Sequence, residues 1–173
     1  MPNNICIYFI LLSLSFSSAS QSKNSEHGAG LCEKEESLLF GFKISDRYKY
    51  MSLCEGRGEN YLTYRFGTPD NVEFQYPEIL DESSWEKFNL HGYSRGGGIA
   101  NDATGDYSTS FTNQGIEYTI FQNWRLVSNE YFLGILINIG EKRIVLRGEQ
   151  GSQSGSLMVL EGKEKLKNEQ DAQ

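Results

Sequence analysis

The sequence predicts an all-β fold, an antiparallel sandwich or small barrel of about seven to eight strands. Apolar residues alternate with polar ones through most of the chain, and turn-forming residues separate the alternating runs at short intervals. No long stretch has the 3.6-residue period of an amphipathic helix. The length of 173 residues, with 38% hydrophobic and 13% aromatic side chains, suits one domain with a substantial core.

The first predicted hairpin begins at residues 38–44, where leucine, phenylalanine and isoleucine alternate on one face of an extended chain. Residues 45–47 supply a turn, and the run YKYMSLC returns as a second strand that ends at Cys54.

A second hairpin is predicted from the stretch YLTYRFGTPDNVEFQYP at residues 61–77. Pro69 suits the second position of its turn, and Pro77 ends the return strand because it has no N–H to donate. The alternation predicts burial of one face only, formed by Leu62, Tyr64, Phe66, Val72, Phe74 and Tyr76.

The second half of the chain begins with a predicted helical turn at DESSWEKF and a flexible segment at YSRGGG. Strands then follow at DYSTSF, IEYTIFQNW, YFLGILIN and RIVLR. Residues 149–173 are rich in glycine, serine and charge, so we expect a mobile tail in which SLMVL alone could add a strand.

The N-terminal residues MPNNICIYFILLSLSFSSAS have the layout of a secretory signal peptide, an apolar run followed by small residues. We therefore expect a signal peptide at 1–20, an N-terminal segment at 21–31 and a β domain at 32–148. Cys32 lies far beyond the apolar run, so a lipid anchor is not expected. Export predicts a periplasmic or secreted protein with no stable membrane anchor.

Removal of the signal peptide would leave Cys32 and Cys54, which pair in an oxidising compartment. Such a disulfide closes a loop of about 22 residues and constrains the unfolded chain by about 3 kcal/mol. A metal site and a catalytic thiol are the competing interpretations. Two cysteines at this spacing and two histidines do not make a ligand set, so neither a metal nor a cofactor is expected.

The chain is acidic, with 23 acidic and 16 basic side chains and a formal charge of −7. This charge argues against nucleic acid as a partner, because phosphates would be repelled. It favours encounter with a basic exported protein such as lysozyme, although solubility alone also explains an acidic surface.

The segment YSRGGG is the candidate partner-binding loop. Consecutive glycines permit close backbone approach to a partner, or simply a bend in a sheet. Tyrosine and arginine are the residue types that dominate the energetics of protein interfaces. The partner-binding candidates are Tyr93, Ser94, Arg95, Gly96, Gly97 and Gly98.

Catalysis is a weaker hypothesis. His91, Ser94 and Asp102 are the residue types of a catalytic triad, but nearness in sequence does not establish their geometry. The acidic pairs Asp81-Glu82 and Glu35-Glu36 could be read as glycosidase carboxylates, yet adjacent acids in loops usually face solvent. No catalytic residue is assigned.

A carbohydrate- or cell-wall-binding module is the third hypothesis. Trp85 and Trp124 could stack on sugar rings, whereas aromatic residues in sheets more often belong to the core. Exposure of both indoles on one flat surface would favour this hypothesis, and burial of both would remove it.

The series MSLCEGRGENYLTYRFGTPDNVEFQYP, YSRGGG and FTNQGIEYTIFQ resembles a group of small secreted bacterial β-proteins, over roughly residues 32–147. This chain departs from the group's pattern at Phe42 and at Leu146-Arg147-Gly148, where the pattern has cysteines. Loss of one disulfide as a unit would explain both departures. The resemblance then implies that the retained pair is Cys32 with Cys54.

In size, compartment and strand content the chain also looks like the periplasmic lysozyme inhibitors, which present a Ser-Gly-x-x-Tyr loop to the enzyme cleft. No such string occurs here, and the nearest segments are residues 94–98 and 154–156. The analogy implies a non-catalytic protein that inhibits an exported hydrolase, lysozyme first, through its loops.

Overall fold

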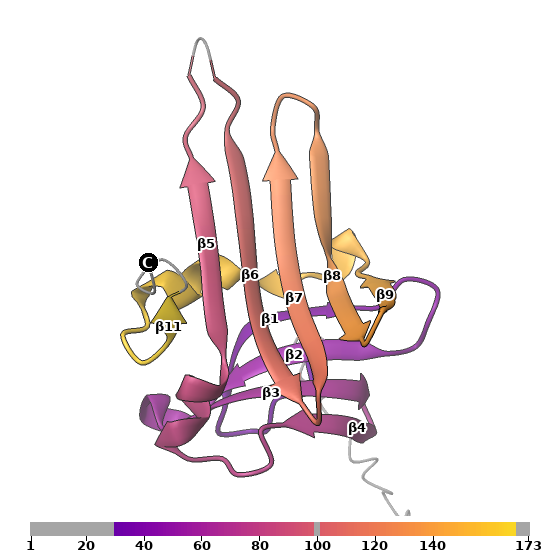
Figure 1. Ribbon diagram of the computed structural model, residues 1–173, viewed down its shortest axis with the longest axis vertical. Helices are drawn as coiled ribbons and strands as arrows, with labels where there is room; N and C mark the ends of the chain where they lie inside the picture. The colour runs from indigo at the N-terminus through magenta and orange to yellow at the C-terminus, as the bar shows by residue number, and fades with distance from the viewer. Residues whose placement is uncertain (1–29, 99–100, 169–173) are drawn as a thin grey trace, which may run out of the picture.

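The protein is an all-β sandwich of two sheets packed against each other, as the sequence predicts (Figure 1). The computed structural model describes residues 30–98 and 101–168. The predicted signal peptide lies outside the described residues. Within the described ranges, no helix is both long and apolar enough to span a membrane.

The smaller sheet has the strand order β10-β1-β2-β3-β4, with every neighbouring pair antiparallel. Its strands are β1 (Ser37–Lys43), β2 (Tyr50–Glu55), β3 (Leu62–Thr68), β4 (Asn71–Tyr76) and the two-residue β10 (Ser154–Gly155).

The larger sheet has the order β11-β5-β6-β7-β8-β9, and it is antiparallel except that the short β11 runs parallel to β5. Its strands are β5 (Asn89–Arg95), β6 (Thr104–Asn113), β7 (Ile116–Arg125), β8 (Glu130–Ile139), β9 (Lys142–Arg147) and β11 (Lys167–Asn168). The four strands from β6 to β9 follow one another along the chain, joined by short turns.

Short 3₁₀ helices connect the strands: η1 (Arg57–Glu59), η2 (Glu82–Lys87), η3 (Gln150–Ser152) and η4 (Leu157–Gly162). The element η2 is the helical turn predicted from DESSWEKF. It begins at Asp81, whose carboxylate accepts a hydrogen bond of 2.9 Å from the backbone N–H of Ser83.

The core lies between the two sheets and is strongly aromatic. The buried ring of Phe111 on β6 stacks on Tyr76 at 4.3 Å and on Tyr118 at 5.0 Å between centroids. The other buried apolar residues of this core include Phe40, Phe42, Ile44, Met51, Leu53, Leu62, Tyr64, Trp85, Phe88, Leu90, Tyr107, Ile120, Leu133 and Ile135.

The N-terminal segment, here taken as the described residues 30–36, covers the outer face of the smaller sheet. The predicted disulfide between Cys32 and Cys54 is confirmed and attaches this segment to β2. The backbone N–H of Leu31 donates to Ser52 Oγ at 2.8 Å, and the guanidinium of Arg65 binds the segment from β3. The prediction of one-face burial for residues 61–77 is therefore wrong for β3, which is buried on both faces, as is β2.

The strand β4 differs from the prediction in the opposite direction. Val72, predicted to be in the core, is 43% exposed, and Phe74 and Tyr76 of the same strand are only partly buried, as is Phe66 of β3, which pairs with Phe74. The reason is that β4 is the edge strand of the smaller sheet, so its side chains have neighbours on one side only.

Residues 149–168 are part of the sandwich, so the expectation of a mobile tail is wrong for them. The run SLMVL forms the start of η4 rather than a strand, and Leu157, Leu160 and Leu166 are buried. Polar contacts also hold this segment, because Lys163 Nζ lies 2.6 Å from Glu55 Oε1. The prediction failed because the three leucines contact a core that distant strands build.

The two sheets join where β1 and β9 end. The backbone of Ser45 donates to the carbonyl of Arg147 at 2.9 Å, next to a bridge between Ile44 and Gly148. Phe42 lies so close to Gly148 that a Cβ there would be 2.6 Å from its ring. Phe42 of β1 and Gly148 after β9 are thus in contact across this junction.

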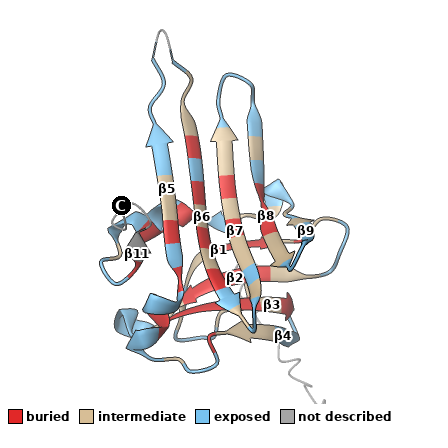
Figure 2. Ribbon diagram, in the orientation of Figure 1, coloured by how far each residue is buried: buried red, intermediate tan, exposed pale blue. Residues whose placement is uncertain are grey.

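Beyond this junction the larger sheet extends past the smaller one (Figure 1). The β5–β6 and β7–β8 hairpins project together, and burial decreases towards their ends (Figure 2). We call this region the projecting end, comprising residues 93–98, 101–107 and 124–131.

Candidate functional site

The predicted partner-binding segment lies in the projecting end, but half of it is strand rather than loop. Tyr93, Ser94 and Arg95 belong to β5 and pair with Asp106, Gly105 and Thr104 of β6, while Gly96–Gly98 follow the strand and are exposed. Side chains alternate along a strand, so Tyr93 and Arg95 share the outer face of the larger sheet and Ser94 lies on the opposite face. The six residues therefore do not form a single contact surface.

Asp102 links the two projecting hairpins. Its backbone carbonyl accepts from Arg95 Nη2 at 3.2 Å, and its carboxylate accepts from the backbone N–H of Val127 at 2.7 Å. The N–H of Leu126 also donates to Ala103 O at 3.0 Å. These contacts join the hairpin ends, so the β7–β8 turn is held in place before any partner binds.

The β7–β8 turn exposes apolar side chains at its end. Leu126 is 68% exposed and Val127 is 82% exposed, and Met158 and Val159 of η4 are also exposed. Sequence reasoning missed these residues because it treated the turn only as a connection. The available signal was an aliphatic pair in a position that turns usually fill with polar residues.

A pocket of about 280 Å³ adjoins this turn on the inner face of the projecting end. Trp124, Leu126, Tyr131 and Met158 are among its lining residues. The indole of Trp124 lies over Gly105, where a Cβ would be only 2.1 Å from the ring, so glycine is required for this close approach.

Two further contacts fix the walls of this pocket. The rings of Trp124 and Tyr107 are nearly parallel, with centroids 5.5 Å apart. On the other side Gln122 Nε2 donates to the hydroxyl of Tyr131 at 2.8 Å, and Gln122 Oε1 accepts from the N–H of Leu157 at 2.8 Å. The pocket is therefore formed in the free protein.

The structure separates the two tryptophans. Trp85 is 1% exposed and its Nε1 donates to Glu59 O at 3.0 Å, so its indole cannot stack on a sugar. Trp124 is partly buried in the pocket described above. The flat surface with two exposed indoles, which would have favoured the carbohydrate hypothesis, is not formed.

The candidate catalytic groups do not converge. His91 lies on the outer face of the larger sheet and Ser94 on the opposite face, while the Asp102 carboxylate binds a backbone N–H of the neighbouring hairpin. Of the acidic pairs, Asp81 caps η2 and Glu36 is paired with Arg65.

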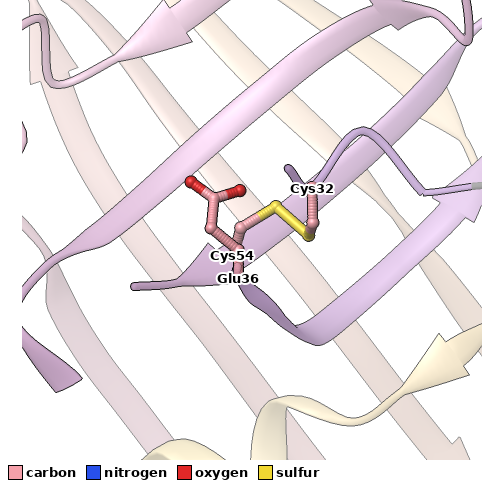
Figure 3. A group of neighbouring side chains, drawn as sticks. All are labelled: Cys32, Glu36 and Cys54. Atoms are coloured by element: carbon pink, nitrogen blue, oxygen red, sulfur yellow. A yellow bond between two sulfur atoms is a disulfide. The ribbon is translucent and has the colours of Figure 1, made fainter. Parts of the chain in front are cut away.

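One cluster combines metal-ligand residue types, namely Cys32, Glu36 and Cys54, whose ligand atoms lie within 4.8 Å of one another (Figure 3). Its sulfur atoms form the disulfide, and the Glu36 carboxylate accepts from Arg65 Nη2 at 2.8 Å and from Tyr61 OH at 2.9 Å. The potential ligand atoms are thus already bonded, and we assign the cluster a structural role.

Burial alone would raise the pKa of Glu36. Hydrogen bonds from Arg65, the Glu33 N–H and Tyr61, together with the charge of Arg65, outweigh that penalty and hold the pKa below its ordinary value. Burial alone would lower the pKa of Arg65. Its hydrogen bonds to Glu36 favour the charged form and outweigh this effect, so the pKa is raised. Both groups are therefore charged at neutral pH.

Comparison of the chain with protein-family models, with curated proteins and with solved structures gives no match.

Proposed function

We propose that the protein is a secreted, non-catalytic binding protein that engages an exported protein partner through its projecting end. The observation that carries this proposal is the apolar end of the β7–β8 hairpin, where Leu126 and Val127 are largely exposed beside a preformed apolar pocket. Exposed apolar groups that gather beside a pocket are typical of interaction sites. Scattered single apolar residues would need no such explanation.

The energetics favour a rigid contact. Burying the side chains of Leu126 and Val127 in a partner would contribute about 1.5–3 kcal/mol each. The hydrogen bonds that the backbone N–H groups of Val127 and Leu126 donate to Asp102 and Ala103 already order the turn, so little conformational entropy is lost on binding. The pocket lined by Trp124 can accept an apolar side chain from the partner.

A hydrolase with an open cleft is the partner class that the shape favours. Two hairpins that project together from a compact body can enter a cleft that a flat surface cannot reach. The formal charge of −7 favours encounter with a basic enzyme such as lysozyme. The disulfide is compatible with the oxidising compartment in which exported hydrolases act.

This proposal moves the centre of the predicted site from one hairpin to its neighbour. Tyr93 remains a candidate contact because it is 48% exposed and tyrosine is a frequent anchor at interfaces. Arg95 is less suited to that role, because its guanidinium is already bonded to the carbonyl of Asp102.

The proposal is tested by titrating the protein against lysozymes of the different structural types at physiological salt, following both binding and lysis. Replacing Leu126 and Val127 together by aspartate should weaken binding at least tenfold, because two carboxylates would be buried in the interface without compensating charges. Ile79→Asp is the matched control, since Ile79 is 71% exposed but lies outside the projecting end.

Thermal unfolding of all variants should be unchanged, because the replaced side chains are exposed. Inhibition that survives the double replacement would refute the role of the β7–β8 turn. Absence of binding to every lysozyme at tens of micromolar would refute lysozyme as the partner.

A further inference from the structure

The outer face of the larger sheet holds a second, separate pocket of about 460 Å³. It lies where β7, β8 and β9 meet the turn after β1, and its lining includes Ser45, Phe121, Asn123, Phe132, Arg147 and Gln150. This volume falls within the range of about 300–1,000 Å³ that small-molecule sites occupy. The pocket is distinct from the apolar one at the projecting end.

Backbone contacts hold the walls of this pocket in place. Ser45 N–H donates to Arg147 O at 2.9 Å, and Gly148 N–H donates to Leu133 O at 2.8 Å. The ring of Phe121 lies against Gly134, where a Cβ would be 2.7 Å from Cζ. The aromatic wall is therefore positioned by a close approach that only glycine permits.

Arg147 supplies a positive charge that the fold itself does not use. Among the described residues, acidic partners pair with Arg65 and Arg125, whereas Arg147 has no ion-pair partner. The neighbouring Glu149 does not neutralise it, because the Glu149 carboxylate is bonded to Lys43 Nζ at 2.8 Å. An unpaired guanidinium in a pocket is suited to bidentate binding of a carboxylate or phosphate.

The other lining groups define the rest of the ligand. Phe121 and Phe132 offer aromatic surface on which the C–H face of a sugar ring can rest. Asn123 adds a polar amide to the lining, and its nitrogen donates to Gln122 O at 2.9 Å and to Asp106 Oδ1 at 3.0 Å. Ser45 and Gln150 add further polar groups at the rim.

We propose that this pocket binds a pyranose sugar that carries an anionic group, with Arg147 on the anion and the two phenylalanines against the ring. The inference is independent of the protein partner proposed above. The two pockets share Tyr131, but Arg147, Phe121 and Phe132, which carry this inference, do not line the apolar pocket. Arg147 has an alternative role, because charged residues on an edge strand such as β9 discourage edge-to-edge association with another sheet. Arg143 of the same strand would serve that role equally well. The experiment must therefore distinguish the two arginines.

The test is titration of the ¹⁵N-labelled protein with glucuronate, glucose 6-phosphate and glucose, followed by amide shifts in NMR spectra. A pocket that covers a single sugar should give affinity in the range of about 1–10 mM. We expect saturable shifts at residues around Phe121 and Arg147 with one or both anionic sugars, and at least tenfold weaker binding of glucose. The comparison of glucuronate with glucose 6-phosphate identifies which anion is preferred.

Arg147→Gln should weaken binding of the anionic sugar at least tenfold, whereas Arg143→Gln should leave it unchanged. Arg143 is the matched control because it lies four residues earlier on the same exposed face and does not line the pocket. Benzoate measures the contribution of an anion without a sugar ring. Absence of saturable shifts, equal weakening by both arginine changes, or benzoate binding as tight as glucuronate would each overturn the inference.

Discussion

Replacing Arg65 by methionine should lower the free energy of unfolding by about 3–5 kcal/mol, the usual cost of removing one partner from a buried ion pair. The side chains of Arg65 and Glu36 are both 1% exposed. The guanidinium also donates to Gln75 Oε1 at 2.9 Å and to Leu31 O at 3.3 Å. Methionine preserves much of the volume of the stem, so the cost comes from the Glu36 carboxylate, which stays buried without its cation.

The pH dependence supplies a second, independent signature. The pKa of Glu36 is depressed in the folded protein, so its contribution to stability is present above its unfolded pKa of about 4.3 and is lost as pH falls through the folded pKa. In Arg65→Met, burial dominates and should raise the folded pKa above the unfolded one. Protonation of Glu36 then favours the folded state of the variant. The difference in free energy of unfolding between the variant and wild type should therefore shrink as the pH is lowered.

The assay is urea denaturation followed by fluorescence at several pH values between about 3 and 7. Glu36→Leu combined with Arg65→Met should recover part of the loss, because apolar replacement of a whole buried pair is often nearly neutral. The double-mutant cycle should give a coupling of about 1–3 kcal/mol. Additive effects, or a loss that is independent of pH, would refute the assignment of a buried and mutually dependent pair.

Three further predictions concern the core, the crosslink and the projecting end. Leu160→Ala should lower the free energy of unfolding by about 2–5 kcal/mol because Leu160 is fully buried, whereas Met158→Ala should cost much less. Reduction of the disulfide should destabilise the protein by about 3 kcal/mol, measured by denaturation with and without reductant. Gly105→Val should displace the indole of Trp124, which near-ultraviolet circular dichroism will detect.

Each of these predictions has an outcome that contradicts it. A Leu160 variant as stable as wild type would mean that η4 does not belong to the core. Equal denaturation midpoints in oxidised and reduced protein would show that the disulfide does not stabilise the fold. An unchanged tryptophan signal in the Gly105 variant would show that the ring is not held over the strand.

Local signals predicted most of the strands. The hairpin at residues 61–77 and the run from β6 to β9 have period-two alternation and turn residues between them, which arise from short-range geometry. The disulfide followed from counting cysteines. By contrast, β5 was not predicted as a strand, and its last three residues fall in YSRGGG, the segment expected to be flexible. Its strand conformation comes from pairing with β6.

Contacts between distant segments could not be predicted in the same way. Arg65 alternates with apolar residues and therefore looked solvent-exposed, but the N-terminal segment covers it. Part of the candidate site has the same origin, because Met158 reaches the pocket from η4. The exposed pair Leu126-Val127 was visible in the sequence, whereas the pocket beside it depends on tertiary structure.

The position of β10 in the smaller sheet constrains the order in which the chain can fold. Phe40 pairs with Gly155, and Lys43 N–H donates to Ser152 Oγ across 109 residues of sequence. A chain that emerges with its N-terminus first must therefore wait for its last fifth before β1 gains its second neighbour. The hairpins of β6 to β9 need no such delay, because each strand pairs with the next one synthesised. The hairpins of β1 to β4 are sequential as well and are synthesised earlier. Until the C-terminal segment arrives, the edge of β1 is therefore the surface most open to wrong pairing.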